Sequence, residues 1–449
     1  MRALVLLALG VAAFVATGSA SAGVSAPCGK VLPPGQGAYF GVMPGWEFSM
    51  PTYDDSVDAT SVPQFELSTG RKVVVAHWRM SWHNGLPFPT KEVELLWREG
   101  YVPQIGLVNW PVQDYGAPQP AQPGPYPNSA IAAGAEDAVL RRYADAARKT
   151  DIPIEFDYDS EMQAAHPWGG RFDGGGATSF GDPTWPDGPE HYRDAYRRII
   201  DIFRQEGATN VTFIFHANTL DQYLAGSYWE PWEALKNYYP GDDYIDWIGL
   251  SVYSEPQFGV GPPQTFEQKL RGADGFEGSY AEITSLTDKP LMLSETGLYR
   301  MPSEDAKAQW VEDASRAIQS GEFPRIKALN WWAQNKGGDY DGYPTSPAFL
   351  NGFKQAFDQP FFDAKAQFSG DCSPLPVRTL RVKGQLLSWA PVPNAASFEV
   401  WRGSLRVATV ARSSFRTSKA GSYRIRAVNL VGFGPFSSPT RLSLVRRAS

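Results

Sequence analysis

The sequence predicts a (β/α)8 barrel of parallel strands followed by a small all-β sandwich domain, and three observations lead to this fold class. First, eight short apolar runs alternate with helical segments between residues 38 and 357, which is the element order of α/β proteins with a parallel sheet. Second, no Gly-rich phosphate-binding motif stands where a doubly wound open sheet, the alternative, would need one. Third, the chain after Cys372 changes to short alternating stretches separated by turn residues.

The eight apolar runs are the predicted barrel strands, at residues 38–42, 73–78, 102–107, 152–157, 211–215, 248–253, 291–294 and 326–331. Helical spacing separates most of them, at residues 91–99, 136–149, 190–206, 231–237, 266–286, 304–320 and 347–357. In the segment 136–149, for example, the apolar positions fall on one face of a helix. In such a barrel the residues that follow the strands gather at one mouth, where ligands bind.

The first 22 residues have the pattern of a secretory signal. Arg2 precedes an apolar run from Ala3 to Val15, and small residues follow up to Ala22, which is typical of a cleavage site. The run is short for a transmembrane helix, and an uncleaved anchor is the alternative. We therefore expect a secreted protein with a signal peptide at 1–22, a barrel domain at 23–372, and a linker and β-sandwich at 373–449.

The chain has two cysteines, Cys28 and Cys372, near the two edges of the predicted barrel domain. In an exported chain a lone pair is more often a disulfide than two free thiols. Because the first and last elements of a barrel are neighbours, we predict a disulfide between Cys28 and Cys372.

Charge is divided unevenly along the chain. Residues 373–449 carry 13 Lys and Arg against one acid, Glu399, whereas the whole chain has a net charge of −7. This basic domain has two interpretations: general solubility, or retention on an anionic cell wall or polysaccharide through a field that salt would screen. Nucleic acid is a weaker interpretation because of the export signal, and we expect a monomer.

Two carboxylates at strand ends are the strongest functional signal. Glu295 follows the run 291–294, and Glu161 ends the segment 151–161. A pair of strand-end carboxylates is the minimal equipment for hydrolysing a glycosidic bond, with one as general acid and the other as nucleophile or base. Asp157 and Asp159 lie on the same strand as Glu161 and are rival candidates for its role.

Several segments carry a family resemblance. They are 39–42 (YFGV), 161–169 (EMQAAHPWG), 215–218 (FHAN), 238–253 (YYPGDDYIDWIGLSVY), 293–297 (LSETG) and 328–332 (ALNWW). Together they resemble glycoside hydrolase family 26, the family of many β-mannanases. The resemblance implies a retaining endo-hydrolase on a (β/α)8 barrel, with Glu161 as acid/base, Glu295 as nucleophile and Tyr253 hydrogen-bonded to the nucleophile. The sequence departs from the family in having Ser160 where a His usually precedes the acid/base.

Aromatic and polar residues near the strand ends are candidate sugar contacts, because pyranose rings stack on indoles. The alternative for each Trp is core packing. The candidates are Trp46, Trp78, Trp168 and Trp332 among the aromatics and His166 and Asn218 among the polar residues. His77, His83 and His216 have no metal-binding spacing, so we expect neither a metal nor a cofactor.

The C-terminal domain carries a second resemblance. Trp389, the segment 423–429 (YRIRAVN) and the segment 432–434 (GFG) are similar to a fibronectin type III domain. No catalytic cluster is found there, and Arg424 and Arg426 are expected to line the solvent face of one strand.

The sequence therefore predicts a secreted, endo-acting, retaining glycoside hydrolase of a β-linked polysaccharide, with β-mannan as the first substrate class. A β-1,3/1,4-glucanase or xylanase on the same scaffold is the first alternative. A non-catalytic carbohydrate-binding or adhesion protein is the second.

Overall fold

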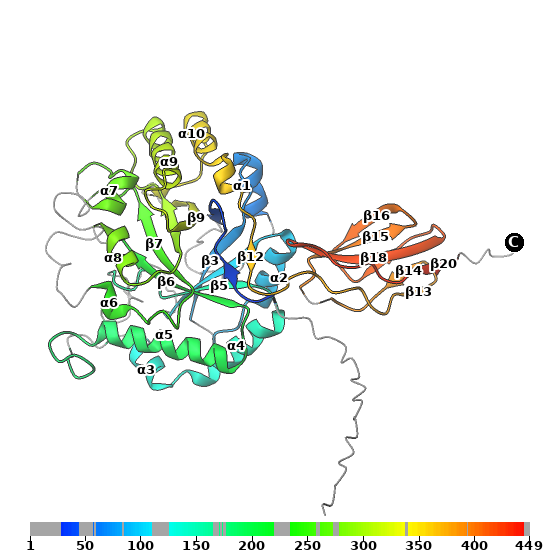
Figure 1. Ribbon diagram of the computed structural model, residues 1–449, viewed down its shortest axis with the longest axis horizontal. Coiled ribbons are helices and arrows are strands. Elements are labelled where there is room, and N and C mark those ends of the chain that lie inside the picture. Colours follow the sequence, from blue (N-terminus) through cyan, green and yellow to red (C-terminus); the bar gives the residue numbers. More distant parts are fainter. Residues whose placement is uncertain are drawn as a thin grey trace, which may run out of the picture.

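The structure is a computed structural model, and it describes residues 28–44, 57, 60–82, 85–109, 125–164, 170, 173, 177–219, 234–256, 261–272, 278–336, 340–392 and 394–443. Figure 1 shows a barrel surrounded by helices and an elongated β domain beside it. The predicted signal peptide at residues 1–22 lies outside the described residues.

Eight parallel strands close into a barrel in the order of the sequence, which confirms the predicted fold class. The last strand pairs with the first, for example Asn330 with Gly41. The strands are β2 (Tyr39–Pro44), β3 (Val75–Ser81), β4 (Val102–Val108), β5 (Ile154–Tyr158), β6 (Val211–Asn218), β7 (Trp247–Tyr253), β8 (Leu291–Gly297) and β9 (Ile326–Ala333).

The helices form an outer ring and bury their apolar faces against the strands (Figure 1). They are α1 (Ser61–Thr69), α2 (Thr90–Glu99), α3 (Asn128–Ala133), α4 (Asp137–Thr150), α5 (Gly188–Gln205), α6 (Leu235–Tyr238), α7 (Phe266–Arg271), α8 (Ser279–Ser285), α9 (Glu304–Gln319) and α10 (Pro347–Phe357). Ser303 and Ser346 cap α9 and α10 by accepting backbone N–H bonds. The single helix predicted at 266–286 is instead two helices, α7 and α8. No helix in the described part of the chain has both the length and the apolar character needed to cross a bilayer.

Side chains of the strands alternate between two apolar clusters. Residues such as Ala76, Trp78 and Leu293 join the large cluster between the strands and the helices. Tyr39, Val75, Trp247 and Met292, among others, form a separate cluster near the starts of the strands, as the period of two requires for side chains that point into a barrel.

The amino ends of the strands are closed by a short N-terminal segment. Strand β1 (Val31–Leu32) pairs with β12 (Gln367–Phe368), and the backbone N–H of Val31 donates to Thr212 Oγ1 at 2.7 Å. The indole of Trp247 donates back to the Val31 carbonyl at 3.2 Å. With this end covered, the carboxyl ends of the strands are the place for a site.

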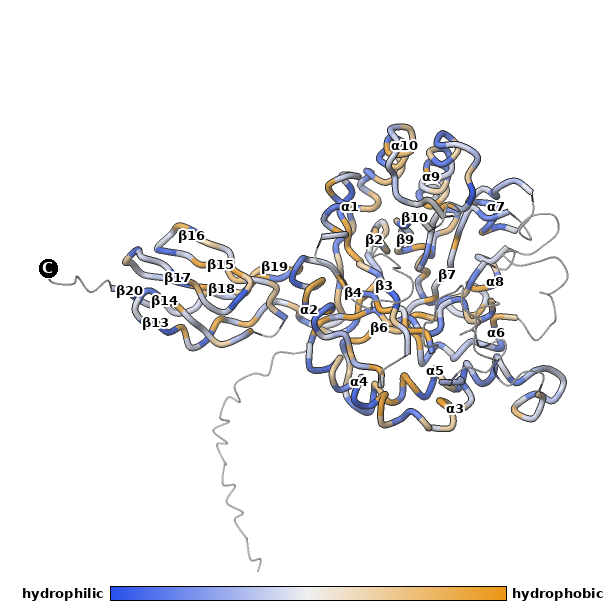
Figure 2. Tube along the Cα trace, turned by 180° about the vertical axis from the view of Figure 1, so that it is seen from behind, coloured by the Kyte–Doolittle hydropathy of each residue, from blue (hydrophilic) through white to orange (hydrophobic). Residues whose placement is uncertain are grey.

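The C-terminal domain consists of two antiparallel sheets. One contains β13 (Arg381–Lys383), β14 (Leu386–Ser388) and β17 (Ser414–Arg416). The other contains β16 (Leu405–Val410), β15 (Ser397–Arg402), β18 (Gly421–Asn429), β19 (Gly432–Phe433) and β20 (Thr440–Leu442). Between the sheets lies a separate core that includes Leu387, Trp389, Val400 and Ile425, and Figure 2 shows hydrophobic residues along β15 and β18.

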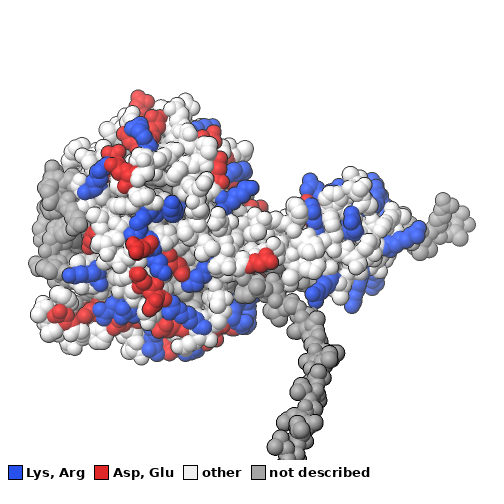
Figure 3. Space-filling view, viewed as in Figure 1, with Lys and Arg blue, Asp and Glu red and all other residues white. Residues whose placement is uncertain are grey.

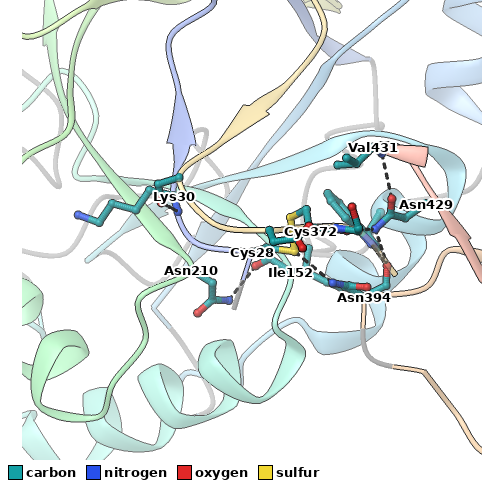
Figure 4. Close-up of a disulfide and its surroundings, with 12 residues drawn as sticks. Cys28, Lys30, Ile152, Asn210, Cys372, Asn394, Asn429 and Val431 are labelled. Atoms are coloured by element: carbon teal, nitrogen blue, oxygen red, sulfur yellow. Dashed lines mark hydrogen bonds between the residues drawn. A yellow bond between two sulfur atoms is a disulfide. The ribbon is translucent and has the colours of Figure 1, made fainter. Parts of the chain in front are cut away.

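A disulfide between Cys28 and Cys372 joins the two edges of the barrel domain, and this confirms the predicted bond. Figure 4 shows that it lies where the sandwich meets the barrel. Asn429 Nδ2 donates to the Cys372 carbonyl at 2.7 Å and to the Asn394 carbonyl at 3.2 Å. The indole of Trp97 on α2 donates to the same Asn394 carbonyl at 2.8 Å. The disulfide therefore belongs to a hydrogen-bonded junction between the two domains.

Candidate active site

Glu295 faces the barrel interior because of a bulge in β8. Leu291 and Leu293 point to the helices, so strict alternation would also turn Glu295 outward. The register shifts instead: Leu250 of β7 pairs with Leu293, but the next residue, Ser251, pairs with Glu295. The extra residue, Ser294, reverses the alternation and re-aims the following side chain, a frequent use of bulges near active sites. The prediction placed Glu295 just beyond the strand, whereas it lies within β8.

The two carboxylate oxygens of Glu295 have different donors. Arg79 from β3 forms an ion pair with Oε1 through Nη2, and the Tyr253 hydroxyl donates to Oε2 at 2.8 Å. Glu295 is only 2% exposed, and a buried charge requires such pairing. The hydrogen bond expected from Tyr253 is therefore present, while Arg79 is a partner that the sequence did not suggest.

Glu161 lies three residues beyond β5 in a turn of unusual backbone conformation. Its φ of 60° and the 47° of Asp159 are in the left-handed region, which costs a non-glycine residue about 1–2 kcal/mol. The turn is held by backbone bonds, because the N–H of Glu161 donates to the His216 carbonyl at 2.9 Å and its carbonyl accepts from Ala164 N–H at 2.8 Å. Glu161 is 5% exposed.

The rival carboxylates are engaged elsewhere. Asp157 hydrogen-bonds the Nδ1 edge of His216 through Oδ2, and both residues are fully buried. Asp159 accepts the backbone N–H of Asn109 at 2.9 Å and the amide of Asn128 at 3.1 Å. Burial raises the pKa of Asp159 well above its usual value. These contacts give both aspartates roles in holding the strand ends.

His216 on β6 connects the elements that carry the two glutamates. Its Nε2 lies 2.9 Å from Ser251 Oγ, and Ser251 is the register partner of Glu295. Burial lowers the pKa of His216, but the Asp157 carboxylate together with Glu295 and Glu161 raises that pKa above the ordinary value. The Glu161 N–H donates to the His216 carbonyl, and Ser251, which His216 contacts, pairs with Glu295. The two glutamates therefore lie on elements that adjoin the same histidine.

The predicted sugar-binding residues lie in different environments in the structure. Trp332 is the last residue of β9 whose side chain points into the barrel. It is 6% exposed and packs edge-on against Tyr253 with ring centroids 6.1 Å apart. Asn218 ends β6, and its buried amide nitrogen has no hydrogen-bond partner within the described part of the chain. Trp46, His166 and Trp168 lie outside the described residues.

The expectation for Trp78 is wrong. This residue is 3% exposed and belongs to the hydrophobic cluster between strands and helices. Its neighbour Arg79 points into the barrel toward Glu295, and successive residues of a strand point to opposite sides. Trp78 therefore packs in the core.

Sequence reasoning missed Arg79 and His216. Each lies one residue beyond a predicted strand, 73–78 or 211–215, and within the longer observed strands β3 and β6. The available signal was that Arg79 is two residues after His77 and so points to the same side of the strand, where a charged residue inside a barrel needs a partner. Within the described residues, no group of three or more His, Cys, Asp or Glu side chains comes together as a possible metal site.

The fold and the site place this chain in the class of α/β barrel proteins. Its two buried glutamates lie near the carboxyl ends of strands, on elements that adjoin His216. No protein-family model matches the chain. The chain is 23% identical over 299 residues to Endoglucanase H of Acetivibrio thermocellus, a match that covers 66% of this chain and 29% of that protein. The chain thus spans under a third of the length of this curated relative.

Solved structures that match this chain include those of two mannanases. An endo-β-1,4-mannanase double mutant of Cellulomonas fimi gives a TM-score of 0.46 at 18% identity, covering 91% of this chain and 94% of that one. The catalytic domain of a family 26 endo-β-1,4-mannanase from a Bacillus species gives 0.49 at 18% identity, covering 73% and 87%.

Proposed function

We propose that this protein is a glycoside hydrolase that cleaves a β-linked polysaccharide internally by double displacement. The observation that supports the proposal is a set of contacts: Glu295 is held by Arg79 and Tyr253, and both Glu161 and the register partner of Glu295 contact His216. In the proposed roles Glu161 is the general acid and base, and Glu295 is the nucleophile.

The chemistry follows from what an acetal requires. Cleavage leaves an oxocarbenium-like centre and expels a poor alkoxide, so one carboxyl must protonate the leaving oxygen while the other attacks the anomeric carbon. Two donors on Glu295 fix its carboxylate in orientation, which is what a nucleophile needs. We expect the two carboxyl groups to lie about 5–5.5 Å apart, the spacing of retaining enzymes.

Two lines support the substrate class. The segments quoted above resemble family 26, whose members include many β-mannanases, and the curated relative is named an endoglucanase. We infer β-mannan as the first candidate and β-glucan or xylan as the next. Trp332 is proposed to stack on a sugar ring and Asn218 to bind a hydroxyl, with Trp46, His166 and Trp168 as further contacts.

The test is a panel of soluble polysaccharides assayed for new reducing ends and product length. We expect internal cleavage of at least one β-linked polymer. Glu161→Gln should lower kcat about a thousandfold or more, because both protonation of the leaving group and activation of water depend on it. Asp159→Asn and Asp157→Asn are matched controls, and each should retain more activity per folded molecule than Glu161→Gln. A protein that binds a polymer without cleaving any would contradict the proposal.

We also propose that the protein is exported by its N-terminal signal and acts outside the cell. The sandwich is proposed to be fibronectin type III-like, supported by the Tyr423 hydroxyl, which donates to the Lys419 carbonyl at 2.6 Å as in the tyrosine corner of such sandwiches. Its basic charge is proposed to retain the enzyme on an anionic polymer.

A further inference from the structure

The outer side of the larger C-terminal sheet carries a cluster of aromatic and arginine side chains. We call it the aromatic–arginine face and define it by Trp401, Arg406, Arg424, Arg426, Phe433 and Phe436. The opposite side of the same sheet supplies Val400, Ile425 and Ala427 to the sandwich core. Such an outward side is usually polar, so large aromatic residues on it need an explanation.

The arginines of this face are stacked on the aromatic rings. The Arg426 guanidinium carbon lies 3.7 Å from the ring centre of Phe433 and 4.9 Å from that of Phe436. Arg424 lies 4.5 Å from the Phe436 ring centre, and Trp401 meets Phe436 edge-on at 5.7 Å. Stacking fixes the guanidinium groups in place, so less side-chain entropy is lost when they bind a ligand.

The face has a net positive charge. Glu399 is the single acid of residues 373–449, and it is occupied by Arg406 and Arg426, each at 2.7 Å. Arg424 and Arg441 are not neutralised by it: Arg441 is exposed and lies opposite Ser422, on the same side as Arg424. Figure 3 shows Lys and Arg without acidic neighbours on the visible side of this domain, while the barrel surface has both signs.

The same domain exposes apolar side chains. On the aromatic–arginine face Phe433 is 62% exposed. An exposed aromatic ring beside uncompensated charge suits an interaction surface. A sugar chain fits this combination, because its rings stack on aromatic groups and its carboxylates pair with guanidinium groups.

We infer that the aromatic–arginine face binds an anionic polysaccharide with carboxylates on successive sugars. Arg424 on β18 and Arg441 on β20 project from the same side of the sheet, and these two guanidinium groups are the ones proposed to pair with the carboxylates. Arg426, which is ion-paired with Glu399 and only 16% exposed, supports the ring of Phe433 instead. This inference rests on the proposal that the basic domain retains the enzyme on an anionic polymer, and it names the surface and the ligand class. It does not depend on the hydrolytic activity of the barrel.

The experiment measures binding of the full-length protein to polygalacturonate, with a neutral galactomannan and single-stranded DNA as comparison ligands. The face variant is Arg424→Gln/Arg441→Gln. The matched control is Arg381→Gln/Lys383→Gln, which removes the same charge from the exposed side of β13 in the other sheet. We expect the face variant to weaken binding about fivefold or more and the control less than about twofold.

A third variant, Phe433→Ala, separates stacking from charge. It should weaken binding at low salt and still do so at about 0.5 M salt, where charge interactions are screened. Equal weakening by the two double variants would overturn the assignment to this face, while leaving retention by the basic domain intact. Absence of binding by the unaltered protein, or tighter binding of DNA than of polygalacturonate, would overturn both. Hydrolysis of a soluble oligosaccharide is measured separately for each variant. Only the proposal of glycoside hydrolase activity depends on that assay.

Discussion

Single residues of this site are defined by their partners more than by their type. The sequence predicted Glu161 and Glu295 because carboxylates near strand ends are unusual and the surrounding segments resemble a family. It did not predict the roles of Arg79 and His216, because Arg79 on β3 reaches across the barrel to β8 and His216 on β6 contacts Ser251 on the neighbouring strand β7, and both contacts join segments far apart in the sequence. Trp78 was wrongly predicted to contact sugar, because the sequence does not show which side chains of β3 point into the barrel. In the structure Arg79 points inward and Trp78 points toward the helices.

Removing the Tyr253 hydroxyl tests whether its bond to Glu295 contributes to turnover. A hydrogen bond to a charged group is worth about 1.5–3 kcal/mol, so Tyr253→Phe should lower kcat about ten- to a hundredfold. Its ring stays against Trp332, so thermal stability should change little. Tyr196→Phe is the control: it deletes a buried hydroxyl bonded to the Ile214 carbonyl at 2.8 Å and should leave turnover per folded molecule unchanged. Equal effects of the two variants on kcat would contradict this role.

Glu155 predicts a pH dependence of stability. It lies on β5, is fully buried, and neither carboxylate oxygen has a hydrogen-bond partner within the described residues. Burial raises its pKa from 4.5 to about 8. Between these values the folded state keeps a proton that the unfolded state has lost, so stability falls as pH rises, by about 5 kcal/mol in total.

The measurement is the Tm of Glu155→Gln between pH 5 and pH 9. The variant lacks the titrating group and should lose less stability over this range than the unaltered protein. Glu94→Gln, at an exposed position on α2, should keep the original pH dependence. Parallel curves for Glu155→Gln and the unaltered protein would exclude this cause.

At the level of elements, strand positions follow from the sequence but strand register does not. The apolar runs located all eight barrel strands, because buried parallel strands are continuously apolar. The bulge at Ser294 depends on pairing with the strands on both sides, and no local pattern encodes it. The prediction of one helix over 266–286 overlooked a local signal, because Gly272, Gly275 and Gly278 fall between α7 and α8.

Gly249 on β7 tests the packing that supports the bulge. A Cβ there would lie 2.4 Å from Ser294 Oγ and 3.1 Å from Ile214 Cγ2. Gly249→Ala should therefore cost about 1–3 kcal/mol of stability and reduce activity by moving Glu295. Because Ser294→Ala removes the closest atom, the double variant should recover part of the stability. Strictly additive losses in thermal unfolding would show that the two positions are not coupled.

At the scale of the whole molecule, the sequence predicted the two domains and the disulfide but not the contacts between the domains. Alternating elements indicated the barrel, and two cysteines near its edges indicated the disulfide. The contacts of Trp97, Asn394 and Asn429 at the junction could not be predicted, because they form between surfaces that meet only after both domains have folded. The charge asymmetry and the shared solvent face of Arg424 and Arg426 were visible in the sequence, but the stacking of these arginines on Phe433 and Phe436 was not.

The disulfide should stabilise the whole chain strongly. It closes a loop with a sequence separation of 344 residues, which in the chain-entropy model corresponds to about 5–6 kcal/mol. Cys28→Ser/Cys372→Ser should lower the Tm markedly, and reduction of the unaltered protein should lower it to a similar value. A Tm unaffected by both treatments would contradict this stabilising role.

The central claim is that Glu295 attacks the anomeric carbon while Glu161 protonates the leaving oxygen. The most direct measurement is proton NMR of the sugar product during the first minutes of hydrolysis of a β-linked oligosaccharide. A nucleophilic Glu295 predicts that the β-anomer forms first, because two inversions restore the configuration. An α-anomer as the first product would mean a single displacement by water, and would contradict the account.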